Sequence, residues 1–296
     1  MKHILSFRGL GLSTCYVASA ALLAASCCNK AEYEYIDEVE GDEIEVVVSD
    51  ENGHLTTLSK GTTVGIYVLD DEKLVSHQKA EVGVDGVTAL STSLSGGALL
   101  GYTPFQDEWG EGVFTDNPVF SVRYQQGTEE NYLASDLLVG KLEQAAKNEI
   151  SSLVLRHMMT KVVISMVDET GRADLRSIGA SLLDMHGRVT VNLKEQSVNT
   201  VLLSWHTIDM FTAPSSDWRV TSYAIVPPQT VNEGSDFYEV TLFGVRQRAP
   251  MQESITWEGG KTYTYNLRIT RQGLIPDGWT ITDWDDVAEQ DIETSQ

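Results

Sequence analysis

Histidines are the side chains in this sequence with the most scope for catalysis or metal binding, and they are scattered along the chain. After His3 they occur at His54, His77, His157, His186 and His206. No two of these lie three or four residues apart, so the sequence predicts no local metal site. A Gly-x-Ser-x-Gly elbow, a P-loop and a His-Glu-x-x-His helix are absent from the sequence. His157 follows the apolar run 153–155, and we interpret it as a strand residue.

Carboxylates gather near the C-terminus, in the run Asp283-Trp284-Asp285-Asp286. Such oxygens can bind Ca²⁺, but the run lacks the alternating acids and the later glutamate of an EF-hand loop. We interpret it as the solvated acidic end of a strand. Carboxylates far apart in sequence can still converge in a fold. The sequence itself contains no constellation that predicts an enzyme, a metal site or a cofactor.

The three cysteines, Cys15, Cys27 and Cys28, all lie near the N-terminus. The rest of the chain is therefore predicted to contain no disulfide and no thiolate metal site. A basic start, an apolar run over 16–23 and the small residues 24–26 indicate a secretory signal peptide. The small tripeptide before Cys27 is similar to a bacterial lipobox. That similarity implies removal of residues 1–26 and a lipid attached to Cys27.

Two alternatives to this lipid anchor remain open. One is an ordinary signal peptide cut near Ser26, and the other is an uncleaved membrane helix. The apolar run is well short of the roughly 18 residues that a membrane-spanning helix needs, which favours the anchor. Cys28 also fits as the lipid acceptor, but the bulkier Cys27 would then precede the cut.

The composition is acidic and moderately hydrophobic. The formal net charge is −22 at pH 7, and hydrophobic residues make up 42% of the chain. Removal of residues 1–26 would take away Lys2 and Arg8 but no acid, so the mature chain would be more acidic still. Such a surface repels nucleic acid and anionic lipid headgroups, so neither is an expected partner. The length allows about two domains of ordinary size.

Beyond an acidic tether over 27–42, short apolar segments recur between Gly, Asp, Asn and Pro, at the spacing typical of an all-β sandwich. The segment 43–48 alternates as a strand does, and so does 63–69. A polar break at Asn148-Glu149 is the predicted boundary between an N-terminal sandwich, 43–149, and a C-terminal sandwich, 150–296. Residues 133–147 are predicted to form a helix, although Gly140 interrupts it and 137–139 would also suit a strand.

The second half has the more regular alternation. Val201, Leu203 and Trp205 are predicted to share one face of a strand, as are Val162, Ile164 and Met166. Gly259-Gly260 is predicted to turn the chain into the clearest half-buried strand. Its predicted inward residues are Tyr263, Tyr265, Leu267 and Ile269, which alternate with polar ones.

Several stretches, taken in order, resemble the fimbrillin family, the lipoprotein-derived subunits of type V pili. They are Asp136-Leu137-Leu138-Val139-Gly140, Leu155-Arg156-His157-Met158-Met159-Thr160-Lys161-Val162, Ser222-Tyr223-Ala224-Ile225-Val226-Pro227-Pro228-Gln229-Thr230, Phe237-Tyr238-Glu239-Val240-Thr241-Leu242, Gly259-Gly260-Lys261-Thr262-Tyr263-Thr264-Tyr265-Asn266-Leu267 and Ile281-Thr282-Asp283-Trp284. The resemblance implies two tandem transthyretin-like β-sandwiches and a place in a fimbria at the cell surface, with a lipid anchor in the outer membrane. It also implies fimbrial subunits as partners, joined by β-strand addition.

The sequence departs from the pilin pattern in one respect. Polymerising subunits of the family are typically cut after an arginine that follows the lipidated cysteine, which releases the first strand. Here no arginine occurs between Cys27 and Arg123, and Arg123 is predicted to lie within a strand. A cut after Lys60 would also remove the strand that contains Ile44, so Lys60 is a candidate site of proteolytic maturation.

Two functional hypotheses follow. The first is a structural subunit, accessory or anchor component of a pilus involved in adhesion. The missing arginine favours an anchor or accessory protein that keeps its lipid and its first strand. The second is an outer-membrane surface lipoprotein that binds glycan or another ligand through sandwich loops. The six tryptophans, including Trp109, Trp205 and Trp218, keep the second hypothesis open.

Overall fold

A computed structural model describes residues 43–50, 52–70, 73–90, 97–110, 117–145, 150–171, 175, 178–203, 205–213, 218–242 and 244–284. The predicted signal peptide, Cys27, the predicted tether and residues 285–296 lie outside the described residues. The described residues all belong to one compact unit. The described part of the chain is nearly all strand, as predicted, and α1 (Glu129–Leu133) is its one α-helix. No helix in that part is long and apolar enough to cross a membrane.

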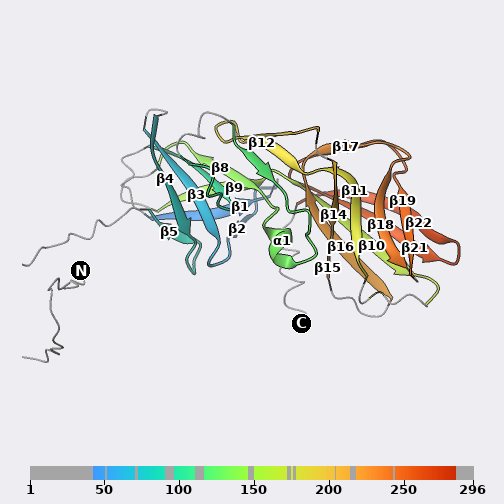
Figure 1. The fold of residues 1–296 in the computed structure, drawn as a ribbon. Helices are drawn as coiled ribbons and strands as arrows, with labels where there is room; N and C mark the ends of the chain where they lie inside the picture. Colours follow the sequence, from blue (N-terminus) through green and yellow to red (C-terminus); the bar gives the residue numbers. More distant parts are fainter. Residues whose placement is uncertain are drawn as a thin grey trace, which may run out of the picture. The chain divides into compact units, whose positions relative to one another are not determined.

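The N-terminal half forms one large sheet, in the order β2-β1-β9-β8-β6-β3-β4, with β5 beside β1 (Figure 1). Its strands are β1 (Glu43–Ser49), β2 (Leu55–Thr57), β3 (Thr63–Asp70), β4 (Lys73–Glu81), β5 (Val87–Ala89), β6 (Ala98–Thr103), β8 (Leu138–Leu142) and β9 (Ser151–His157). The pair β1 and β9 is parallel, whereas the other pairs of this sheet are antiparallel.

The C-terminal half contains a five-stranded sheet, β15-β16-β10-β21-β22, and a four-stranded sheet, β14-β11-β18-β19. The first comprises β10 (Thr160–Asp168), β15 (Phe211–Thr212), β16 (Arg219–Val226), β21 (Lys261–Thr270) and β22 (Gly273–Asp283). The second comprises β11 (Ala180–His186), β14 (Trp205–Asp209), β18 (Asp236–Leu242) and β19 (Val245–Pro250). Smaller sheets join β7 (Val119–Ser121), β12 (Arg188–Asn192) and β13 (Ser197–Thr200), and β17 (Gln229–Val231) with β20 (Ile255–Trp257).

Most of the strands predicted from alternation are present. β21 lies between β10 and β22, and its inward residues Tyr263, Tyr265, Leu267 and Ile269 are at most 5% exposed. The predicted turn before it is confirmed, because Gly260 has a φ of 73°, a value that glycine adopts without strain. β16 ends at Val226, directly before Pro227-Pro228, as expected of residues that lack an amide donor.

The helix predicted over 133–147 is wrong, and the strand alternative at 137–139 is the better description. Thr128 caps α1 by accepting a hydrogen bond from the Asn131 amide, and the helix ends at Leu133. Leu138 and Val139 then belong to β8, which pairs with both β6 and β9. These partners are distant in sequence, so local spacing alone did not reveal the strand.

Two further local expectations are also wrong. Arg123 was predicted to lie within a strand, but β7 ends at Ser121. The proposed shared face of Val201, Leu203 and Trp205 is divided by a loop, because β13 ends at Thr200 and β14 begins at Trp205. Leu203 lies in that loop and is 94% exposed.

β9 follows the domain boundary that was predicted at Asn148-Glu149, yet it is hydrogen-bonded within the first sheet, between β1 and β8. β10 begins two residues after β9 ends and belongs to the five-stranded sheet. We therefore propose that the boundary between the two sandwiches lies between His157 and Thr160.

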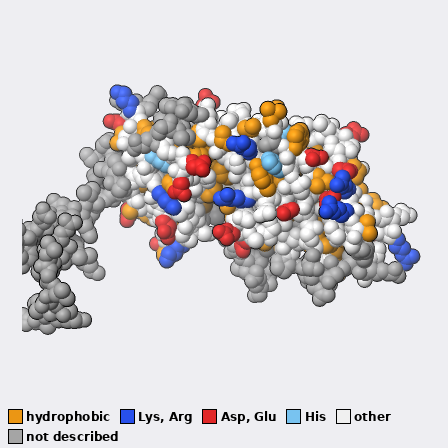
Figure 2. Space-filling view, in the orientation of Figure 1, with side chains coloured by type: hydrophobic (Ala, Val, Ile, Leu, Met, Phe, Trp, Pro, Cys, Tyr) orange, Lys and Arg blue, Asp and Glu red, His pale blue; other side chains and the backbone are white. Residues whose placement is uncertain are grey.

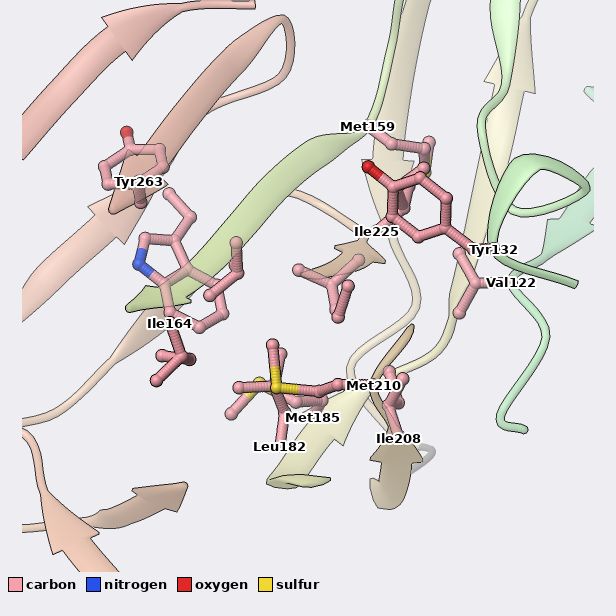
Figure 3. Packing of buried hydrophobic residues seen from close by; sticks show 14 of the residues in the cluster. Val122, Tyr132, Met159, Ile164, Leu182, Met185, Ile208, Met210, Ile225 and Tyr263 are labelled. Atoms are coloured by element: carbon pink, nitrogen blue, oxygen red, sulfur yellow. The ribbon is translucent and has the colours of Figure 1, made fainter. Parts of the chain in front are cut away.

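Two hydrophobic clusters stabilise the fold. The smaller one contains Ile44, Val46 and Val48 of β1 together with buried residues of the other strands of the first sheet. The larger one continues from the first sheet through the C-terminal sheets, and Figure 3 shows part of it. Tyr132 of α1 belongs to this cluster and is 5% exposed, which explains how so short a helix is held.

Candidate functional site

The first strand, β1, is an internal strand of its sheet. It pairs in parallel with β9 from Ile44 opposite Ser151 to Val48 opposite Leu155. On its other side it pairs with β5 near Glu43 and with β2 near Ser49. In the uncut chain both edges of β1 are therefore hydrogen-bonded within its own sheet.

The burial of β1 makes spontaneous release unfavourable. Ile44, Val46, Val47 and Val48 are each at most 4% exposed. Full burial of such a side chain stabilises by about 1.5–3 kcal/mol, so these four together contribute on the order of 6–12 kcal/mol. A whole domain is stable by only about 5–15 kcal/mol. Loss of β1 would thus need either a replacement strand or a large loss of stability.

Lys60 lies in an exposed turn between β2 and β3. The turn is anchored on both sides of Lys60. The Gly61 amide donates to the Val82 carbonyl over 2.9 Å, and the Thr62 amide donates to the Ser59 carbonyl over 3.1 Å. Gly61 has a φ of 88°, which favours glycine at this point of the turn. A protease would reach Lys60 from solvent, and a cut after it would separate β1 and β2 from the rest of the chain.

A hollow of about 880 Å³ lies next to this turn, and we call it the β2–α1 hollow. Its walls come from β2 and the following turn, from Thr103-Pro104, and from the region of α1. Leu58, Pro104, Leu133 and Leu138 are among its apolar lining residues, threonines and a serine line much of the rest, and Glu130 and Asp136 bring carboxylates to it. Leu133 is 52% exposed at this place. The sequence did not predict this hollow, because its walls come from segments that lie far apart in the chain.

Trp284 is the last residue that the structure describes, and its side chain is buried. It is 2% exposed, and its ring stacks on His157 with centroids 4.1 Å apart and planes 8° apart. The Lys161 Nζ lies 5.4 Å from the centroid of the indole ring, within the range of a cation–π contact. The carboxylate of Asp136 holds the His157 Nδ1 at 2.9–3.0 Å. Trp284 therefore fastens the end of β22 to the end of β9.

The acidic run at 283–286 is only partly within the described residues. Asp283 ends β22 and pairs with Lys261 at 2.6 Å, and it also accepts a hydrogen bond from Asn52 at 3.3 Å. Asp285 and Asp286 lie outside the described residues. Among the described residues, no group of three or more His, Cys, Asp or Glu side chains would hold a metal ion.

The histidines serve as packing and pairing groups at separate places. His54 pairs with Asp50, His206 stacks on Tyr124, and His77 stacks on Tyr67. His157 is the last residue of β9, which confirms that it is a strand residue. Near His77, burial raises the pKa of Tyr67 to about 12 and also raises the pKa of Tyr102. Both phenols therefore stay protonated at neutral pH, and Tyr67 donates to the Trp109 carbonyl over 3.0 Å.

The three tryptophans considered for glycan binding do not form one platform. Trp109 is only 3% exposed, whereas Trp205 and Trp218 are 62% and 55% exposed. Trp205 pairs with His186 across strands β14 and β11. The His186 amide donates to the side chain of Gln229, which follows shortly after β16. The last residue of β16, Val226, pairs with Thr160 at the start of β10. Trp218 precedes Arg219, which pairs with Val167 near the other end of β10. The two exposed indoles thus lie at opposite ends of β10.

Solved structures share this fold at low sequence identity. A candidate cell adhesion protein from Bacteroides uniformis is 17% identical, with a TM-score of 0.62 over 82% of this chain and 97% of that one. One from Bacteroides ovatus is 16% identical, with a TM-score of 0.64 over the same shares. The tip fimbrial protein Mfa3 from Porphyromonas gingivalis, with a C-terminal truncation, is 8% identical, with a TM-score of 0.50 over 82% of this chain and 100% of that one. No curated protein matches the chain.

The family comparison agrees with the resemblance seen in the sequence motifs. The model of the family described as fimbrillin-like matches residues 40–284, which span β1 to Trp284 and most of the chain. The match begins just before the first strand and ends at the tryptophan that fastens β22 to β9. On this evidence, the chain belongs to the fimbrillin-like family.

Proposed function

We propose that this protein is a fimbrial component at the cell surface, of the anchor or accessory kind, held in the outer membrane by a lipid on Cys27. The observation that carries the proposal is the family match over residues 40–284, combined with a first strand that is hydrogen-bonded to other strands along both edges. The two sandwiches would be the tandem transthyretin-like domains of the family. Adhesion and fimbrial roles are also those named for the structural neighbours.

Three features favour a component that keeps its first strand. The chain has no arginine between Cys27 and Arg123 for the usual maturation cut. Lys60, the substitute, lies in a turn that two main-chain hydrogen bonds hold in place. The four buried side chains of β1 oppose its departure even after a cut.

The sequence of residues 285–296 is also poorly suited to a donor strand. Residues 285–296 offer Val287, Ala288 and Ile292 as apolar side chains, and aspartates and glutamates surround them. A donor strand must fill an acceptor groove with alternate side chains. A carboxylate buried there without a partner would cost several kcal/mol. We therefore expect its partners to be other fimbrial subunits, joined to it by strand addition that involves neither the removal of β1 nor residues 285–296 as a donor strand.

Mass spectrometry of the N-terminus of the cell-surface form tests this proposal. We expect a chain that begins with acylated Cys27 and contains residues 43–60 in covalent continuity with the rest. A chain that starts at Gly61 within high-molecular-weight polymers would instead assign the protein to the fimbrial shaft.

The Cys27→Ala variant is expected to lose its attachment to the membrane. Lipid chains supply membrane affinity at about 0.8 kcal/mol per buried CH₂, and an acidic tether adds no attraction to anionic lipid. The measurement is the share of protein that stays with membranes after a carbonate wash. Cys28→Ala is the matched control and should stay attached. Retention of the Cys27→Ala variant would show that the anchor lies elsewhere.

A further inference from the structure

A hollow of about 520 Å³ lies at the turn between β21 and β22, and we call it the β21–β22 end pocket. Its lining includes two buried apolar residues from different sheets, Leu242 of β18 and Ile269 of β21, which are 3% and 1% exposed. Thr170, Gln247 and residues 270–273 complete its described lining. A hollow of this volume, with an apolar base and a few polar side chains, is typical of a small-ligand site.

Hydrogen bonds fix the chain around this pocket. The Thr270 hydroxyl donates to the Gly273 carbonyl over 3.0 Å and accepts from the Gln272 amide over 3.1 Å, so it closes the turn between the two strands. The amide and the hydroxyl of Thr170 both donate to the Asp168 Oδ1, over 2.8 Å and 2.7 Å. A pocket whose walls are held in this way loses little conformational entropy when a ligand binds.

The charge of this pocket is unusual for so acidic a chain. Arg271 is the one charged side chain in the part of its lining that the structure describes. Two other hollows bear carboxylates: Glu130 lies at the β2–α1 hollow, and Asp50 and Glu195 line a hollow of about 560 Å³ beside Trp284. The chain has 43 Asp and Glu against 21 Lys and Arg, so a pocket with a lone positive charge favours an anionic ligand.

The Arg271 guanidinium is available to such a ligand. It is exposed, and no carboxylate of the described residues pairs with it. Other arginines of these strands differ, because Arg268 pairs with Glu169 at 2.9 Å and Arg248 pairs with Glu239 at 2.9 Å. A guanidinium can hold a carboxylate or another oxyanion by two parallel hydrogen bonds. Figure 2 shows basic side chains at the end of the molecule where Figure 1 places β19, β21 and β22.

We propose that the β21–β22 end pocket binds an acidic saccharide, with Arg271 paired to its carboxylate or sulfate group. The amides of Gln247 and Gln272 both donate and accept hydrogen bonds, as sugar hydroxyls do. Leu242 and Ile269 provide an apolar base for the C–H face of a sugar ring. Nucleic acid does not suit this site, because a single cation lines it and the chain as a whole repels a polyanion. Saccharide recognition would add a ligand to the proposed fimbrial role.

The first test is binding of the full chain, purified from cells, to immobilised uronic, sialylated and sulfated oligosaccharides. Each is paired with its neutral counterpart, which is the methyl ester of the carboxylate or the desulfated sugar. We expect at least one acidic saccharide to bind about tenfold or more tightly than its counterpart, as measured by titration calorimetry. Absence of binding, or equal binding within every pair, would overturn the proposal. Peptides with a free C-terminal carboxylate are tested beside their amides, and discrimination among peptides alone would also overturn it.

Removal of the charge then tests the pocket itself. Arg271→Gln is expected to weaken binding of the acidic saccharide about tenfold or more and to leave binding of the neutral counterpart unchanged. Arg246→Gln is the matched control, because it makes the same change in net charge on β19, where the Arg246 side chain is 75% exposed and lies outside the lining of the pocket. It should change the affinity by less than about twofold. Equal losses in the two variants would indicate general electrostatic attraction and would overturn the assignment of the pocket.

Two further variants test the contacts. Arg271→Lys keeps the charge but loses the two-point contact, so it should bind more tightly than Arg271→Gln and less tightly than the unaltered chain. Gln272→Ala should weaken binding of both members of a pair and keep the preference for the acidic one. Both residues are exposed, so the unfolding temperature should not change. An Arg271→Gln chain that keeps full affinity would exclude the proposed contact. An unlipidated Cys27 would contradict the proposed function and leave the binding result valid.

Discussion

Replacement of Gly140 by alanine is expected to cause the largest loss of stability of any small substitution in the first sheet. Gly140 lies in β8, opposite Gly101 of β6 and Leu155 of β9. A Cβ at this position would lie 2.0 Å from the Val154 carbonyl oxygen and 2.8 Å from the Leu155 Cδ2. The first of these atoms is main chain, so the β8–β9 ladder would have to open. We expect a loss above about 4 kcal/mol in the free energy of unfolding.

Urea unfolding followed by circular dichroism measures this loss, with Gly127→Ala as the matched control. Gly127 has no neighbouring atom within 4 Å of an added Cβ. Its substitution should change the free energy of unfolding by no more than about 1 kcal/mol. Equal unfolding midpoints for the two variants would show that β8 does not pack against β9 as described.

Truncation of Tyr265 to alanine is expected to have the next largest effect. The side chain is 5% exposed in β21, and large-to-small changes in a core cost about 2–5 kcal/mol. Its hydroxyl also accepts a hydrogen bond from the Trp257 Nε1 over 2.9 Å. Trp257 is fully buried, so loss of the acceptor leaves a donor without a partner and adds about 1–3 kcal/mol. Leu267→Ala should show the packing loss without the hydrogen-bond loss.

Tyr265→Phe separates the two contributions, because it removes the hydroxyl and keeps the ring. It should cost less than Tyr265→Ala and still more than polar exchanges on the opposite side of β21. Thr264→Ser and Asn266→Ser serve as those exchanges, since both residues are only partly buried. Thermal unfolding of the series provides the comparison. Equal sensitivity on both sides of β21 would contradict its alternating burial.

The strands with regular alternation were predictable because their signal is local. In β21 and in the second half of β10, buried side chains alternate with less buried ones, so burial of one face leaves a period of two in the sequence. The turn at Gly260 and the end of β16 before Pro227 were equally predictable, since glycine and proline restrict the backbone by themselves. Family membership followed from ordered motifs that most of these strands contain.

The errors fall where the partner strand decides the outcome. Residues 133–147 have spacing that suits neither element clearly, and β8 forms there because β6 and β9 lie on either side of it. β9 joins the first sheet because β1, more than a hundred residues earlier in the sequence, supplies its neighbour. No local pattern records either pairing.

The sequence by itself therefore determined the all-β class, the main strands of the second half and the family. Only the tertiary structure decided that β1 is hydrogen-bonded to other strands along both edges, that Trp284 stacks on His157, and that the β2–α1 hollow lies beside the turn that contains Lys60. Alternation records which side of a strand is apolar. It does not record whether another strand, a loop or solvent covers that side, because this depends on contacts between segments far apart in the chain.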